Sequence, residues 1–179
     1  MFSIPNLFTL LRLLLAPVVI RAILHGDHRL ALAVFALAAL TDAIDGALAR
    51  RFRWITVTGA YLDPIADKVL LSGVYLALGL TGTLPWWFVG LIFGRDALIL
   101  LGGAIALFFT GYRKFEPSVW GKLSTTFQAF TGVWWMVRNV LEVPMADAVG
   151  QVLIWPTAAA TAWSGLHYGW RMLRASRTH

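Results

Sequence analysis

Apolar residues gather into six long runs along the chain, and short polar breaks separate them. The runs cover about residues 7–24, 30–51, 59–80, 85–109, 119–141 and 148–171. Glycine, proline or charge marks the breaks at residues 25–28, 51–53, 81–83, 111–118 and 142–147, and such residues end regular structure. A membrane-spanning helix needs about 20 mostly apolar residues, and its backbone must satisfy its own hydrogen bonds. The pattern therefore predicts an all-α integral membrane protein with six transmembrane helices.

The composition agrees with this pattern. The chain has 179 residues, of which 59% are hydrophobic and 13% are charged, whereas a soluble domain carries about 25% charged residues. Six spans with short loops leave no room for a second domain, so residues 1–179 are expected to form a single six-helix domain. The chain has no cysteine, which excludes disulfides and thiolate metal sites.

The formal net charge of +6 indicates anionic lipid headgroups and no nucleic acid as partner, because the basic residues flank the apolar runs. Six helices place both termini on one side, together with the loops after the second and fourth runs. That side collects Arg50, Arg51, Arg53, Arg113, Lys114, Lys122, Arg171, Arg174 and Arg177. Basic loops stay in the cytoplasm, so both termini are expected there. We expect a bacterial inner membrane, with the matrix side of a mitochondrial inner membrane as the alternative.

The first apolar run contains a charged residue, Arg12. An apolar N-terminus resembles a signal peptide, but no small-residue cleavage site precedes the next polar break. The first run is therefore expected to be a helix that the protein retains.

Four aspartates lie in the second and third runs. Asp42 and Asp45 are spaced i, i+3, and Asp63 and Asp67 are spaced i, i+4, so each pair lies on one helix face. The second helix is expected to run toward the cytoplasm and the third to run back. At about 1.5 Å rise per residue, the four carboxylates fall within roughly 6–12 Å of the cytoplasmic ends of these helices. Two antiparallel neighbours can therefore bring the four acids together.

Four anions at one point need positive partners, because buried charge is costly and like charges oppose one another's ionisation. Divalent metal ions are the simplest partners. Oxygen ligands without histidine or cysteine favour Mg²⁺ or Mn²⁺ over zinc, and two ions about 3.5–4 Å apart serve phosphoryl displacement. The alternative is a divalent-cation transporter, whose binding site usually lies near the middle of the bilayer. The predicted position near one surface favours chemistry on a headgroup.

The aspartates belong to a longer pattern, which reads Asp42-x2-Asp45-Gly46-x2-Ala49-Arg50-x8-Gly59-x3-Asp63-x3-Asp67. It resembles, without a gap or substitution, the signature of the CDP-alcohol phosphotransferases, also called CDP-alcohol phosphatidyltransferases. The start of the chain, Pro5-Asn6-x2-Thr9-x2-Arg12, is similar to the first-helix pattern of that family. The resemblance implies a membrane enzyme with six helices around a cytoplasm-facing active-site cavity. Such an enzyme transfers a phosphatidyl group from CDP-diacylglycerol to an alcohol and releases CMP.

The resemblance also implies roles for the signature residues. The ligands of two Mg²⁺ or Mn²⁺ ions would be Asp42, Asp45, Asp63 and Asp67. Asp67 would in addition act as the catalytic base on the acceptor hydroxyl. The residues expected at the CDP group are Gly46, Ala49, Arg50 and Gly59. Family members are homodimers, so a homodimer embedded among membrane lipids is expected.

The acceptor site must come from residues outside the signature. Candidate acceptor-binding residues are Arg95, Arg113 and Lys122. Arg95 and its neighbour Asp96 predict either an ion pair that stabilises packing or a polar floor of the cavity. Lys122 is expected to share one polar stripe, facing the site, with Ser124, Thr125 and Gln128.

Three segments outside the signature, at residues 94–96, 121–128 and 159–169, look most like the cardiolipin synthases of the family. This similarity implies phosphatidylglycerol as the acceptor and cardiolipin as the product. The alternative acceptor is glycerol 3-phosphate, which gives phosphatidylglycerophosphate. A soluble dianion needs a basic pocket open to water, whereas a lipid acceptor needs a lateral opening with apolar walls.

Overall fold

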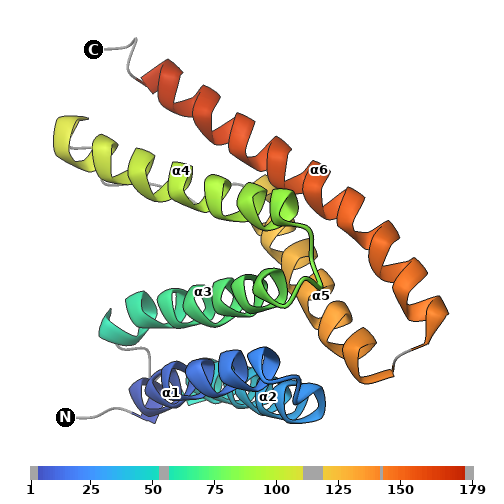
Figure 1. Cartoon of the computed structure of the whole chain (residues 1–179). Helices are drawn as coiled ribbons and strands as arrows, with labels where there is room; N and C mark the ends of the chain where they lie inside the picture. Colours follow the sequence, from blue (N-terminus) through green and yellow to red (C-terminus); the bar gives the residue numbers. More distant parts are fainter. Residues whose placement is uncertain (1–3, 53–56, 111–118, 142, 176–179) are drawn as a thin grey trace. The chain divides into compact units, whose positions relative to one another are not determined.

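The computed structural model describes residues 4–52, 57–110, 119–141 and 143–175, with backbone alone for 4–8, 42–52, 57–64, 103–110 and 171–175. Figure 1 shows that these residues form helices, and no strand occurs among them. The helices are α1 (Ile4–Leu24), α2 (His28–Phe52), α3 (Val57–Leu80), α4 (Trp86–Thr110), α5 (Val119–Leu141) and α6 (Pro144–Ala175).

The six predicted helices are confirmed as helices, and most of their ends agree with the predicted runs within about two residues. The start of α6 was predicted at residue 148, but the helix begins at Pro144. Proline suits a first helical turn because the N–H that it lacks has no partner there in any case. The carbonyl oxygen of Val143 accepts the N–H groups of Ala146 and Asp147 at 3.0 and 3.4 Å, and the acid in this first turn complements the helix dipole.

The length and hydropathy of each helix can be compared with what a membrane span requires. Within the described part of each helix, no stretch is both long and apolar enough to cross a membrane. The prediction of six spans therefore stays a prediction.

The chain divides into two compact units, Met1–Leu84 with Asn139–Leu141 and Pro85–Arg138 with Glu142–His179. In the first unit α1 packs against both α2 and α3 (Figure 1). The buried face of α3 includes residues spaced four apart: Ala66, Leu70, Val74 and Leu78. Small side chains allow close approach between helices, and they recur here on α1 and α2 as Ala16, Ala22, Ala31 and Ala38.

α1 lies close to α3 at Gly73. A Cβ added to Gly73 would lie 2.5 Å from Cδ1 of Ile20, well inside van der Waals contact. The turn between α1 and α2 contains Gly26 at φ +78°, a conformation that L side chains rarely adopt. These glycines therefore allow α1 to lie against its neighbours. The two helices that carry the acidic signature, α2 and α3, both pack against α1.

In the second unit α4 packs against α6, and hydrogen bonds join α5 to α6. The hydroxyls of Thr131 and Thr157 lie 2.7 Å apart, and Nε1 of Trp134 donates to the carbonyl of Ala146 at 3.0 Å. An ion pair between Arg138 and Asp147 joins the last turn of α5 to the first turn of α6. Polar contacts therefore help to fix the positions of these helices.

Candidate functional site

The acidic signature lies on the two helices that residues 53–56 connect. Asp42 and Asp45 lie in the second half of α2, and Asp63 and Asp67 in the first half of α3. The five peptide units between the helices span at most about 18 Å. Counted from these helix ends at 1.5 Å per residue, all four positions lie about 9–15 Å along their helices. The two pairs therefore lie at similar distances along their helices from the connecting segment.

Most of the predicted metal and CDP ligands have side chains outside the described residues. Those with a described backbone alone are Asp42, Asp45, Gly46, Ala49, Arg50, Gly59 and Asp63, and Arg113 lies outside the described chain altogether. Among the side chains that the structure does describe, no group of three or more acidic, histidine or cysteine residues could hold a metal ion. The roles assigned to these residues therefore stay predictions.

The side chain of Asp67 is described, and it contacts α1. Nη1 of Arg12 donates a hydrogen bond to Oδ1 of Asp67 at 2.5 Å. The Arg12 side chain is only 2% exposed, whereas that of Asp67 is 57% exposed. A buried arginine therefore holds a carboxylate that has much of its surface accessible to a ligand.

The position of Arg12 follows from the buried face of α1. Arg12, Ala16, Val19 and Ile23 are all buried, and their spacing of three to four residues puts them on one side of the helix. A guanidinium cannot lose its charge in a protein, so a buried one needs an acidic partner. The sequence analysis noted Arg12 as a charge in the first apolar run and as part of the first-helix pattern, but assigned it no role. The sequence did contain a signal of this role, because a charged arginine inside an apolar helix needs a carboxylate partner on a neighbouring helix.

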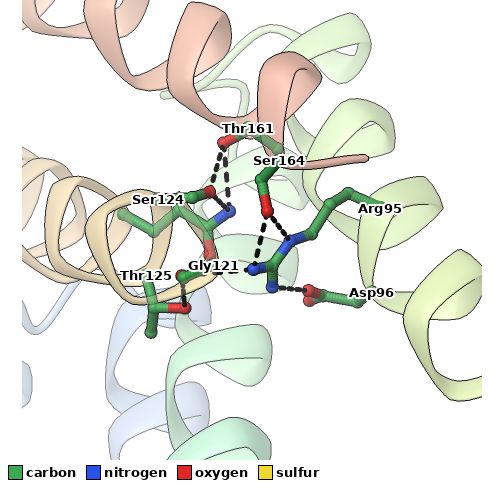
Figure 2. Close-up of polar contacts among 8 residues, drawn as sticks. Arg95, Asp96, Gly121, Ser124, Thr125, Thr161 and Ser164 are labelled. Carbon is green, nitrogen blue, oxygen red and sulfur yellow. Dashed lines mark hydrogen bonds and ion pairs between the residues drawn. The ribbon is translucent and has the colours of Figure 1, made fainter. Parts of the chain in front are cut away.

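Arg95 lies in a second buried polar cluster, between α4, α5 and α6 (Figure 2). Its Nη1 donates to Oδ1 of Asp96 at 3.0 Å, and its Nη2 donates to the carbonyl of Gly121 at 3.2 Å. Both Nε and Nη2 donate to Oγ of Ser164, at 3.3 and 3.2 Å. The predicted ion pair of Arg95 and Asp96 is confirmed. The guanidinium also ties the first turn of α5 to α4 and α6.

The polar residues of α5 do not form the single stripe that was predicted. Ser124 and Gln128 are buried, and both bond Oγ1 of Thr161 on α6, at 3.3 and 3.1 Å. Lys122 is exposed. Residues i and i+2 on a helix point in directions about 200° apart, so Lys122 and Ser124 point in nearly opposite directions. Ser124 and Gln128 therefore hold α5 on α6, whereas Lys122 and Thr125 are the exposed members of this group.

The predicted site residues with described side chains are divided between the two units. Asp67 belongs to the first unit, and Arg95 and Lys122 belong to the second. Arg95 is buried with its guanidinium nitrogens bonded to protein atoms, so its described contacts are those of a packing residue. The prediction that it contacts the acceptor stays a prediction.

Comparison with known proteins agrees with the acidic signature. The family model for CDP-alcohol phosphatidyltransferase matches residues 2–163. The chain is 34% identical over 182 residues to a probable phosphatidylglycerophosphate synthase of Mycobacterium tuberculosis, covering 96% of this chain and 82% of that protein.

Two further relatives carry different names. The CMP-forming cardiolipin synthase of Rattus norvegicus is 33% identical over 94% of this chain and 62% of its own length. The CDP-diacylglycerol–glycerol-3-phosphate 3-phosphatidyltransferase of Aquifex aeolicus is 33% identical over 84% of this chain and 85% of its own length. The match of the family over nearly the whole chain shows that this protein is an enzyme of the CDP-alcohol phosphatidyltransferase family.

Proposed function

We propose that the enzyme transfers the phosphatidyl group of CDP-diacylglycerol to phosphatidylglycerol, which gives cardiolipin and CMP. The observation that supports the transfer chemistry is the setting of Asp67, whereas phosphatidylglycerol as the acceptor rests on the similarity of residues 94–96, 121–128 and 159–169 to cardiolipin synthases. This carboxylate is accessible and is held by a buried arginine. Asp67 lies as many residues after the start of α3 as Asp42 lies before the end of α2, within the signature that resembles the donor site of the family.

The proposed chemistry is a direct displacement at phosphorus. Asp67 accepts the proton of the acceptor hydroxyl, because an alcohol is a poor nucleophile at neutral pH. The hydroxyl oxygen forms a bond to the phosphorus that carries diacylglycerol, and the bond from that phosphorus to the oxygen of the CMP phosphate breaks. CMP is a good leaving group, so no covalent intermediate with the enzyme is required.

We propose that two Mg²⁺ or Mn²⁺ ions act at this site, held by Asp42, Asp45, Asp63 and Asp67. A donor set made of carboxylate oxygens suits these hard cations, and the accessible carboxylate of Asp67 fits such a role. The ions would supply positive charge to the diphosphate and the departing CMP. Gly46, Ala49, Arg50 and Gly59 are the proposed contacts of the CDP group.

Glycerol 3-phosphate is the second candidate acceptor, because enzymes named for that acceptor are as similar to this chain as cardiolipin synthases are. Both acceptors carry phosphate, and the exposed Lys122 is the proposed contact for it, with Arg113. The experiment offers labelled CDP-diacylglycerol and each acceptor in turn to the purified enzyme, and then resolves the lipid products. Cardiolipin supports the proposal and phosphatidylglycerophosphate supports the alternative. Hydrolysis to CMP with neither acceptor consumed would contradict both.

We propose that the enzyme works as a homodimer in a bacterial inner membrane, with the active site and both termini cytoplasmic. Large apolar side chains exposed on the helices support contact with lipid, among them Leu100, Trp155 and Leu166 at 69%, 69% and 71%. The protein should stay with the membrane fraction after an alkaline carbonate wash, and its detergent complex should contain two protomers by light scattering. Release by the wash would contradict an integral membrane protein, and a monomeric mass would contradict the homodimer.

A further inference from the structure

We propose that Arg12 is the positioning residue of the reaction: it orients the carboxylate of Asp67 toward the acceptor hydroxyl. This inference rests on the proposed function of Asp67. It adds a residue of α1, outside the acidic signature, to the machinery of transfer.

The geometry distinguishes this contact from an ordinary surface ion pair. Exposed pairs contribute little because both side chains are mobile and hydrated. Here the Arg12 side chain is 2% exposed and lies in the packing of α1, while the carboxylate that it holds is 57% exposed. The side chain of Arg12 is thus the fixed partner. Its Nη1 lies 2.5 Å from Oδ1 of Asp67, and this hydrogen bond restrains the orientation of the carboxylate.

The surroundings of Arg12 make its position rigid. It continues the buried face of α1 formed by Ala16, Val19 and Ile23, and α1 packs against both helices of the acidic signature. Asp67 follows the fully buried Ala66 on α3, so the start of its side chain is also anchored. Two packed helices therefore define the direction of the carboxylate, as catalysis by an oriented base requires.

Orientation, and not substrate affinity, is what the substitution of Arg12 should change. Removing a partner that orients a functional group typically costs about 10–100-fold in activity. We expect Arg12→Gln to lower kcat by about that factor with little change in the KM for CDP-diacylglycerol. Arg12→Lys keeps the charge and one donor but not the planar fork, so its kcat should lie between those of Arg12→Gln and the unmodified enzyme.

The test measures CMP release by the full-length enzyme with the acceptor that it uses, together with thermal unfolding of each variant. Arg21→Gln is the matched control, because Arg21 is an exposed arginine of the same helix, and its kcat should be unchanged. If Arg12→Gln does not fold, Arg12→Lys decides the question by its lowered kcat at unchanged KM.

Three results would overturn the inference: a folded Arg12→Gln or Arg12→Lys enzyme with full kcat, a loss confined to KM, or an equal loss in Arg21→Gln. Failure of the proposed function itself looks different. In that case the unmodified enzyme would convert neither acceptor into a lipid product, whatever residue stands at position 12.

Discussion

Lys122 combines a positive charge, an exposed side chain and a position on the first turn of α5. A charge-assisted hydrogen bond to phosphate contributes about 1.5–3 kcal/mol. Lys122→Gln should therefore raise the KM for the phosphate-bearing acceptor by about 10–100-fold and leave the KM for CDP-diacylglycerol nearly unchanged. Steady-state kinetics with each substrate varied in turn measures this. Arg29→Gln, at an exposed position of α2, is the control, and an equal rise there would argue against a specific contact.

The sequence predicted a site role for Asp67 because four acids in fixed spacing have few explanations in an apolar chain. It did not identify the partner of Asp67. The two residues are 55 positions apart, and only the packing of α1 on α3 brings them together. The same limit explains the error at Lys122 and Ser124. Both are polar residues near the start of one helix, but their 200° separation sends them to different surroundings.

The buried cluster around Arg95 is expected to stabilise the packing of α4, α5 and α6, and substitutions can test this. Arg95 and Asp96 are each 8% exposed, and removing one partner of a buried pair costs about 3–5 kcal/mol. Arg95→Met should lower the free energy of unfolding by about that amount. Arg138→Met removes a pair whose side chains are 32% and 46% exposed, and it should cost below about 1 kcal/mol. Denaturant unfolding in detergent compares the two, and equal losses would contradict the structural role of Arg95.

The contact of α5 with α6 depends on a glycine. A Cβ at Gly150 would lie 3.0 and 3.1 Å from the Cζ2 and Cε2 atoms of Trp135, a rigid and buried ring. Overpacking costs about 1–3 kcal/mol, which exceeds the helix propensity of about 1 kcal/mol gained over glycine. Gly150→Ala should therefore lower the unfolding temperature. Gly90→Ala meets no atom within 4 Å and should raise it slightly. A Gly150→Ala protein as stable as Gly90→Ala would contradict this packing.

The helices themselves were predictable, since long apolar runs interrupted by glycine and charge leave few alternatives. Their contacts were less predictable. Ser124, Gln128 and Thr161 bond one another across α5 and α6, although each residue taken alone resembles a site residue. Burial separates polar groups that hold helices together from those that face a ligand, and one sequence does not report burial.

For the whole molecule, the family explains why the acids indicate a transferase and not a cation transporter. The signature fixes the donor side of the reaction. It says little of the acceptor, because Arg95 and Lys122, which are proposed to bind it, lie on α4 and α5 at positions without a comparable pattern. The relatives reflect this, since cardiolipin and phosphatidylglycerophosphate synthases match the chain about equally.

The proposed metal ions make a prediction for the complete enzyme. If four carboxylates hold two divalent ions, removal of the ions leaves the acids to repel one another and the diphosphate without its counter-charge. Treatment with EDTA should reduce CMP release to background, and addition of Mg²⁺ or Mn²⁺ should restore it. An assay with CDP-diacylglycerol and the preferred acceptor measures both steps. Activity that survives thorough chelation would show that the acids serve another purpose.

The most direct measurement compares CMP release by the unmodified enzyme and by Asp67→Asn, with Mg²⁺ present. Asparagine keeps the size of the side chain and an oxygen that can accept the bond from Arg12, but it is a far weaker base. General base catalysis contributes about 10²–10⁴-fold, so kcat should fall by at least 10²-fold in a protein that elutes as a folded species. Asp27→Asn, at an exposed position before α2, should keep full activity. A folded Asp67→Asn enzyme with unchanged kcat would contradict the role of Asp67 in transfer.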